Sequence, residues 1–209
     1  MTAPWHHHPA KRIVDIVASA TALVVLSPVM VAVAAAVRAN MGRPVLYRQE
    51  RTGLGGKVFP LYKFRTMSSE FDRARREIPE DQRITRLGRF LRSTSLDELP
   101  QLVHILRGEM SLVGPRPLLP EYVDLYSHDQ ARRLTVRPGL TGLTQVNGRN
   151  ALAWDHKFHL DVVYVDQATA AMDLRIIVST IARVLRPRGV VAEGHASSPR
   201  FTGSKHERG

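Results

Sequence analysis

The sequence predicts a small, membrane-associated α/β domain, and three features carry that prediction. Residues 13–37 form a run of 25 residues whose only charged side chain is Asp15. Residues 42–67 alternate between apolar and polar on both sides of a glycine-rich turn, which is typical of a β-hairpin. Residues 83–92 carry leucine, isoleucine and phenylalanine on one helical face and arginine at three-residue steps, a pattern typical of a basic amphipathic helix. We therefore expect an N-terminal re-entrant membrane hairpin, a short β-hairpin and amphipathic helices at the membrane interface. For residues 83–92, a surface helix that packs on the protein's own core is an equally good alternative.

The composition fits one compact domain and excludes several kinds of site. The chain has 209 residues, a net charge of +11 and no cysteine. Without cysteine there is no disulfide framework, no cysteine-ligated zinc and no thiol nucleophile. The charge predicts an anionic partner, and nucleic acid, anionic lipid and phosphorylated metabolites fit it equally well.

Four segments follow from the pattern along the chain. Residues 1–10 are expected to be a flexible leader, in which His6, His7 and His8 are only a weak signal for metal binding. Residues 11–40 are expected to form the membrane segment, and residues 41–187 are expected to form the main folded domain. Residues 188–209 are polar and are expected to be a disordered tail.

The apolar segment is long enough to cross a hydrocarbon core of roughly 30 Å. Basic residues flank it on both sides, so both ends favour the cytoplasmic face. These are Lys11 and Arg12 before the run, and Arg38, Arg43, Arg48 and Arg51 after it.

Ser27 and Pro28 supply a break in the middle of this run. Pro28 cannot donate a hydrogen bond to the carbonyl of Val24, and the Ser27 hydroxyl can bond a carbonyl that is freed in this way. We expect two short helices that enter and leave the membrane by the same face. A kinked spanning helix, a buried core helix and a cleaved signal peptide are the alternatives.

The remaining elements are less regular. The glycines at 53, 55 and 56 lie in a turn that lacks the Gly-Lys-Ser or Gly-Lys-Thr ending of a P-loop. Leucines at 99, 102 and 106 predict a helix that ends at Gly108, and residues 111–150 are expected to be irregular loops with a helix between them. Residues 158–167 predict a short strand or a helical turn. A last amphipathic helix is expected to be capped by Asp173 and to end before Pro187.

The segment RSTSLDELPQL carries adjacent carboxylates, Asp97 and Glu98, at the expected start of a helix. They fit ordinary capping, because Ser95 and Glu98 match a capping box. They also fit catalysis if the fold brings cations to them, since paired carboxylates hold Mg²⁺ and a carboxylate can attack phosphorus. The candidate phosphate-binding cations are Lys63, Arg65, Arg92 and Arg116.

Five motifs occur in one order: the apolar hairpin at Ser27-Pro28, KFRTM (63–67), LDELPQL (96–102), SLVGPRP (111–117) and PGLTGLTQVNGRN (138–150). In this order they resemble the bacterial sugar transferase family. The chain is similar to the monotopic phosphoglycosyl transferases that act as undecaprenyl-phosphate sugar-phosphate transferases, in their minimal catalytic form.

This resemblance implies transfer of a sugar phosphate from a UDP-sugar to a polyprenyl (undecaprenyl) phosphate, with release of UMP. Asp97 would be the nucleophile that forms a covalent aspartyl-phosphosugar intermediate. Asp97 and Glu98 would bind Mg²⁺, while Lys63, Arg65, Arg92 and Arg116 would hold phosphate groups. A loop with Gln145, Asn147, Arg149 and Asn150 would lie near the nucleotide sugar.

The resemblance also implies a location and partners. The protein is expected on the cytoplasmic face of the bacterial inner membrane, on anionic phospholipid, at the first membrane step of polysaccharide or glycoconjugate assembly. Downstream glycosyltransferases are expected as partners, and nucleic acid is not. A membrane-tethered basic nucleic-acid-binding protein is the alternative, but it leaves Asp97 and Glu98 without a role. A secreted basic protein, formed by signal cleavage, is a third hypothesis.

Overall fold

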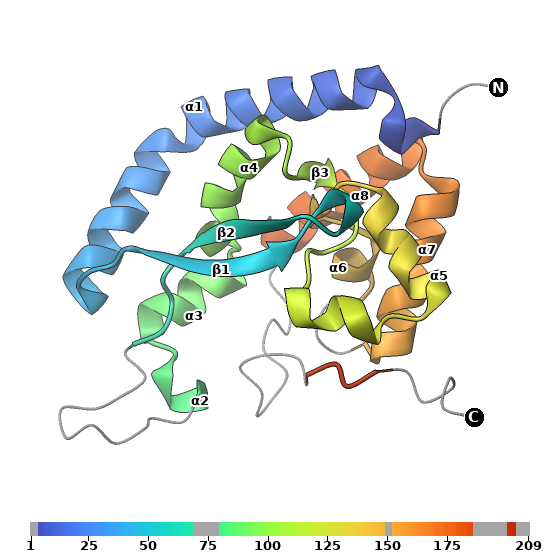
Figure 1. Ribbon diagram of the computed structural model, residues 1–209. Coiled ribbons are helices and arrows are strands. Elements are labelled where there is room, and N and C mark those ends of the chain that lie inside the picture. Colours follow the sequence, from blue (N-terminus) through green and yellow to red (C-terminus); the bar gives the residue numbers. More distant parts are fainter. Residues whose placement is uncertain (1–3, 69–79, 149–151, 186–199, 204–209) are drawn as a thin grey trace.

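The computed structural model describes residues 4–68, 80–148, 152–185 and 200–203. Helices and strands are mixed along the chain, with two separate two-stranded sheets among the described residues (Figure 1). The strands are β1 (Leu46–Thr52), β2 (Val58–Phe64), β3 (Ser111–Val113) and β4 (Gly139–Thr141). The α-helices are α1 (Pro9–Met41), α2 (Glu80–Arg83), α3 (Arg86–Ser93), α4 (Leu102–Arg107), α5 (His128–Ala131), α6 (Leu143–Asn147), α7 (Trp154–Gln167) and α8 (Ala170–Leu185). The 3₁₀ segments are η1 (Trp5–His7), η2 (Leu54–Gly56), η3 (Leu96–Gln101), η4 (Pro120–Leu125) and η5 (Arg132–Thr135).

Helix α1 is one continuous element, so the prediction of two helices separated at Ser27-Pro28 is wrong. Pro28 lies inside the helix, and its ring leaves the carbonyl of Val24 without an amide donor. The Ser27 hydroxyl donates a hydrogen bond of 2.8 Å to that same carbonyl. The hydrogen bond expected from Ser27 to the freed carbonyl is therefore present. The helix bends at this region without breaking (Figure 1).

Most of α1 is not covered by the rest of the protein. By length and composition the helix can cross a membrane, and only 11% of its most apolar window is buried. Two of its side chains, Val33 and Val37, do pack into a core cluster with Phe64 and Leu91. A buried core helix does not fit this exposure, and a cleaved signal peptide does not fit the packing of α1 on the domain. The exposed apolar surface makes membrane association plausible.

The predicted β-hairpin is confirmed. Strands β1 and β2 pair antiparallel from Leu46 opposite Phe64 to Thr52 opposite Val58. The turn contains Gly55 and Gly56 at φ 64° and 78°, a left-handed conformation that favours glycine. On β2, alternate residues face one side, and Phe59 and Leu61 are buried there against α4. Lys63 continues that face, which turns its side chain toward η3.

Helix α3 is shorter than residues 83–92, because Thr85 caps its start by accepting a hydrogen bond from the Gly88 amide. Leu91 is buried and Leu87 packs beside it, whereas Phe90 is 56% exposed. The amphipathic helix therefore packs on the protein's own core while leaving one aromatic side chain outside. The predicted helix before Gly108 is divided in two, as η3 and α4.

The C-terminal half contains more regular structure than the sequence predicts. Residues 111–150, expected to be loops around a helix, include the parallel pair β3–β4 as well as α5 and α6. Gly139 permits this pairing, because a Cβ at that position would lie 2.1 Å from the Gly114 amide nitrogen. Residues 158–167, expected to be a short strand or helical turn, belong to the 14-residue helix α7.

The predicted last helix is α8, but Asp173 does not act as its cap. Its carboxylate accepts hydrogen bonds from Trp5, Lys11 and Tyr164, which ties the start of α1 to α7 and α8. Part of the expected tail is also packed. Phe201 is 4% exposed and lies among the aromatic rings of Tyr122 and Phe158, so residues 200–203 depart from the disordered tail expected over 188–209.

Candidate active site

Asp97 and Glu98 lie in the first turn of the 3₁₀ segment η3. The chain enters this segment through Ser95, which has φ 57° and is the one non-glycine residue with positive φ among the described residues. Such backbone conformations cluster at functional sites. Ser95 makes no side-chain capping bond, so the capping-box interpretation of Ser95 and Glu98 is wrong. The two carboxylates are therefore available for contacts across the fold.

Glu98 joins three elements of the chain. Its Oε1 accepts a hydrogen bond of 2.6 Å from Lys63 Nζ, on β2, and one of 2.8 Å from Arg116 Nη2, in the loop after β3. Burial alone would raise the pKa of Glu98, but the charges and hydrogen bonds of Arg116 and Lys63 outweigh it and hold that pKa well below its usual range. Glu98 thus stays ionised and fixes both cations.

Asp97 has the opposite environment. It is 7% exposed, and no described residue donates a hydrogen bond to its carboxylate. Burial and the neighbouring charge of Glu98 raise its pKa to about 6, against the opposing charges of Lys63, Arg92 and Arg116. Adjacent carboxylates whose environments push their pKa values apart are a pattern typical of catalytic sites.

Two further cations of the prediction differ in their placement. Arg92, on α3, donates to Thr66 Oγ1 at 3.0 Å, and its charge acts on Asp97. Arg65 instead donates to the backbone carbonyls of Met67, Met41 and Arg43, which ties β2 to the end of α1. These contacts use Nε and Nη1 of the Arg65 guanidinium, and phosphate binding by Arg65 stays a prediction.

Sequence reasoning did not place Arg51 and Lys157 at this site. Burial, followed by repulsion from Arg116, lowers the pKa of Arg51 to about 10. Burial also lowers the pKa of Lys157, on α7, and Arg116 is the next cause. Both cations therefore lie within electrostatic reach of Arg116. No local signal marks either residue, because one lies in a strand and the other in a helix of mixed polarity.

A buried network fixes the backbone of Arg116. Arg133 donates a hydrogen bond of 2.6 Å from Nη2 to the Arg116 carbonyl, and its Nε donates one of 3.0 Å to Asp161 Oδ2. Thr144 Oγ1 donates to the other oxygen of Asp161 at 2.9 Å. Helices α6 and α7 thereby hold the loop in which Arg116 lies between two prolines.

The loop expected near the nucleotide sugar is only partly described. Gln145 is buried in α6, and neither atom of its side-chain amide has a hydrogen-bond partner. Asn147 donates to the carbonyl of Leu143. Arg149 and Asn150 lie outside the described residues. Within the described part, Gln145 is the residue of this loop whose buried side-chain amide has no hydrogen-bond partner.

The residues present fit a magnesium ion that is shared with a phosphate ligand. No group of three or more histidine, cysteine or acidic side chains converges among the described residues. Two adjacent carboxylates remain, and Mg²⁺ in proteins is commonly bound by one or two carboxylates together with water and substrate phosphates. Glu98 Oε1 is already engaged by two cations, so Asp97 and the second oxygen of Glu98 are the available ligands.

Comparisons with known proteins match the chain over most of its length. The family model described as bacterial sugar transferase matches residues 6–187. The uncharacterised sugar transferase EpsL of Bacillus subtilis is 47% identical over 194 residues, which cover 93% of this chain and 96% of that protein.

Two further relatives have more informative names. The undecaprenyl-phosphate galactose phosphotransferase of Salmonella typhimurium is 40% identical over 86% of this chain and 41% of its own length. The UDP-glucose:undecaprenyl-phosphate glucose-1-phosphate transferase of Caulobacter vibrioides is 39% identical over 84% of this chain and 69% of its own length. The chain therefore belongs to the bacterial sugar transferase family and is a transferase.

Proposed function

We propose that this protein transfers a sugar phosphate from a UDP-sugar to a polyprenyl phosphate such as undecaprenyl phosphate. The observation that carries the proposal is the unequal pair of carboxylates. Glu98 is held by Lys63 and Arg116, whereas Asp97 is buried without a described hydrogen-bond donor beside the same cations. Names of two relatives support the substrate class, because each contains undecaprenyl phosphate as the acceptor.

In the proposed first step, an Asp97 carboxylate oxygen attacks the phosphorus that bears the sugar. The bond from this phosphorus to the bridging oxygen breaks, and UMP leaves with the electron pair of that bond. Asp97 then carries the sugar phosphate as an acyl phosphate. Lys63 and Arg116 are proposed to stabilise charge on the phosphate oxygens, and their hydrogen bonds to Glu98 support this role because they hold both cations in position.

In the second step, a phosphate oxygen of the polyprenyl phosphate attacks the same phosphorus. The bond to Asp97 breaks, the carboxylate is regenerated, and the sugar diphospholipid leaves. Bound Mg²⁺ would neutralise negative charge on the diphosphate of the donor. Arg92 and Arg51 are the further cations of this chain proposed to bind phosphate oxygens.

We also propose that the protein is monotopic, with α1 inserted in the inner membrane from its cytoplasmic face. Support comes from the basic residues on both flanks of the apolar run and from the exposed apolar surface of α1. Anionic phospholipid and phosphate-bearing substrates together account for the net charge of +11. The nucleic-acid-binding alternative is not favoured, because it leaves the carboxylate pair unexplained.

The covalent step is tested with UDP-sugar labelled in the sugar and with no lipid acceptor. Wild-type protein in detergent with Mg²⁺ should release UMP once and carry one labelled phosphosugar on the peptide that contains Asp97. Asp97→Asn should fold and carry no label, since an amide is a poor nucleophile. Asp124→Asn, which neutralises an exposed aspartate on η4, is the matched control and should label normally. Normal labelling of Asp97→Asn would remove this mechanism.

A further inference from the structure

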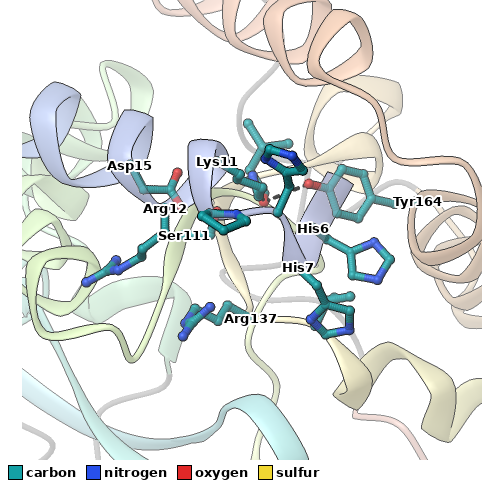
Figure 2. A pocket seen from close by; sticks show the side chains of 12 residues that line it. His6, His7, Lys11, Arg12, Asp15, Ser111, Arg137 and Tyr164 are labelled. Atoms are coloured by element: carbon teal, nitrogen blue, oxygen red, sulfur yellow. Dashed lines mark hydrogen bonds between the residues drawn. The ribbon is translucent and has the colours of Figure 1, made fainter. Parts of the chain in front are cut away.

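A second polar pocket lies where the start of α1 meets β3 and the segment before β4 (Figure 2). Its volume is about 200 Å³, and its walls include His6, Lys11, Arg12, Ser111 and Arg137. None of the residues that line it belongs to the Asp97–Glu98 site. The proposed reaction therefore gives this pocket no role.

The charge of the pocket favours an anion. Lys11 is neutralised, because its Nζ lies 2.6 Å from Asp173 Oδ2. Arg12 donates only to backbone carbonyls, those of Ile105 and Leu106, and Arg137 donates through Nε to the carbonyl of Gly108. Neither guanidinium forms an ion pair with a described residue, so both keep an uncompensated charge beside the pocket.

The one acidic residue in the lining does not offset these charges fully. Asp15 is buried, and its Oδ1 accepts a hydrogen bond of 3.1 Å from the Leu112 amide. With Lys11 paired to Asp173, the lining contains two arginines, Arg12 and Arg137, against the one carboxylate of Asp15. The three histidines do not form a metal-binding group with any described acid. An anion fits this site better than a cation does.

Two buried polar atoms in the lining have no partner. Ser111 is 1% exposed, and its hydroxyl makes no hydrogen bond; Nδ1 of His6 is also buried and unpaired. An unpaired buried polar group costs free energy, so most such groups in proteins have a partner. A hydroxyl donor in a pocket that two arginines also line matches the oxygens of a phosphate.

We propose that this pocket binds the phosphate group of an anionic membrane phospholipid. The volume lies below the roughly 300 Å³ typical of pockets for drug-sized ligands, so a headgroup phosphate fits it better than a nucleotide does. The apolar run begins beside the pocket, at Ile13, which is 61% exposed. Given the membrane insertion proposed above for α1, the pocket lies at the level of the lipid headgroups.

The occupant would add a contact between the start of α1 and the domain to the hydrogen bonds that Lys11, Arg12 and Asp15 already make there. Lys11 and Arg12 on α1 and Arg137 before β4 would share one phosphate, in addition to the Lys11–Asp173 ion pair. Bound lipid should therefore stabilise the folded protein and be retained through purification in mild detergent.

The test compares full-length wild type with Ser111→Ala and Arg137→Gln, each in a neutral detergent. Thermal unfolding is followed with rising concentrations of short-chain phosphatidylglycerol, short-chain phosphatidylcholine or inorganic phosphate, and native mass spectrometry measures the lipid that is retained. Arg107→Gln is the matched control, because Arg107 is exposed at the end of α4 and does not line the pocket. The catalytic cations are the same in every variant, so differences between variants report on the pocket.

Wild type and Arg107→Gln should retain anionic lipid and gain stability with phosphatidylglycerol. Ser111→Ala and Arg137→Gln should each need about tenfold more of that lipid for the same gain, since one charge-assisted hydrogen bond is lost. Ser111→Ala should unfold at or slightly above the wild-type temperature when no lipid is present, because it removes a buried hydroxyl that has no protein partner. An equal response of all four proteins would overturn the proposal.

The other probes separate the sources of the phosphate group. An equal gain with phosphatidylcholine would contradict the selection of anionic lipid. A response to inorganic phosphate alone, with the same dependence on Arg137, would assign the pocket to a soluble anion and overturn the lipid. Flotation with vesicles tests membrane binding of the protein separately. A failure of the proposed membrane binding can therefore be told apart from a failure of the proposed lipid site.

Discussion

At the residue scale, the two neighbouring carboxylates show how the same side-chain chemistry is given two roles. Glu98 is fixed as an anion by Lys63 and Arg116, and its removal would leave these two neighbouring cations without their shared counter-charge. Asp97 is buried beside an anion and has no described donor, so its charged form is disfavoured in the folded state. The fold thus stabilises the ionised form of Glu98 and disfavours the ionised form of Asp97.

The charge on Asp97 should lower the stability of the folded protein. Its carboxyl ionises near pH 3.8 in an unfolded chain and near pH 6 when folded, so the folded state binds more protons between these values. The free energy of unfolding should therefore fall as pH rises through this window, by on the order of 2–3 kcal/mol. Asp97→Asn removes the effect and should raise the melting temperature by several degrees at pH 7.5.

Thermal unfolding from pH 4.5 to 8 measures this difference. The advantage of Asp97→Asn over wild type should be small at the acidic end and should grow until pH exceeds about 6. Glu98→Gln is the contrasting variant and should be less stable than wild type at neutral pH. A constant difference between Asp97→Asn and wild type across the range would contradict the buried-charge account.

Arg51 should contribute to donor binding, although the sequence does not single it out. Its Nε is buried and has no hydrogen-bond partner, and repulsion from Arg116 shows that it lies near the phosphate site. Arg51→Gln should raise the KM for UDP-sugar by about tenfold or more through loss of a charge-assisted contact. Steady-state UMP release measures this KM. A KM like that of wild type would show that Arg51 does not contribute to donor binding.

Arg48→Gln provides the control for Arg51. Both residues lie on β1, but three positions apart, so they face opposite sides of the hairpin, and Arg48 is exposed. The Arg48 change removes the same charge from the same strand. It should leave the KM for UDP-sugar near the wild-type value if the effect of Arg51 is local.

At the element scale, the sequence predicts elements whose pattern is local. Strands β1 and β2 alternate around glycines, and that information lies entirely within their own residues. Helix α7 escapes prediction because its buried face contains Lys157 and Asp161 along with Phe158 and Tyr164. Asp161 is buried because Arg133, which is distant in the sequence, pairs with it. Because this tertiary ion pair buries a charged residue, the buried face of α7 does not show as an apolar stripe in the sequence.

The site residues divide in the same way, into those marked by a local motif and those placed only by tertiary contacts. Asp97, Glu98, Lys63 and Arg116 are predictable because each lies in a motif of the family, although only the fold shows that Glu98 joins the two cations. Arg51 and Lys157 approach the site through tertiary packing alone. The helix α1 was predicted in type and place, but its continuity through Pro28 depends on the hydrogen bond from Ser27.

The bent helix α1 should have both ends on the cytoplasmic side. Single cysteines at Pro4 and Asn40, placed in a chain that has none, should both be labelled by an impermeant maleimide only after the cells are opened. The basic residues on both flanks make this the favoured orientation. Labelling of Pro4→Cys in intact cells, with Asn40→Cys protected, would show that α1 spans the membrane.

At the scale of the whole molecule, exposed apolar side chains gather on two helices that are far apart in the sequence. Helix α1 exposes a large share of its valines, and α8 exposes an apolar stripe formed by Leu174, Val178, Ile181 and Leu185. These four follow helical spacing, so they share one face. Contiguous apolar surface of this kind marks a membrane or protein contact. With a net charge of +11, an anionic membrane is the better match.

The apolar stripe of α8 should therefore lie in the lipid interface when the protein is in a bilayer. Its two best probes are neighbours: Val178 is in the stripe, while Ser179 is rotated by about 100° and is exposed beside it. Each is changed singly to cysteine, labelled with a fluorophore and placed in nanodiscs. Quencher-bearing lipid should quench the Val178 probe several-fold more than the Ser179 probe, and aqueous iodide should show the reverse order, because only the stripe is immersed. Equal access of iodide to both probes would place α8 in water, and protection of Val178 from both quenchers would show that another protein surface covers it.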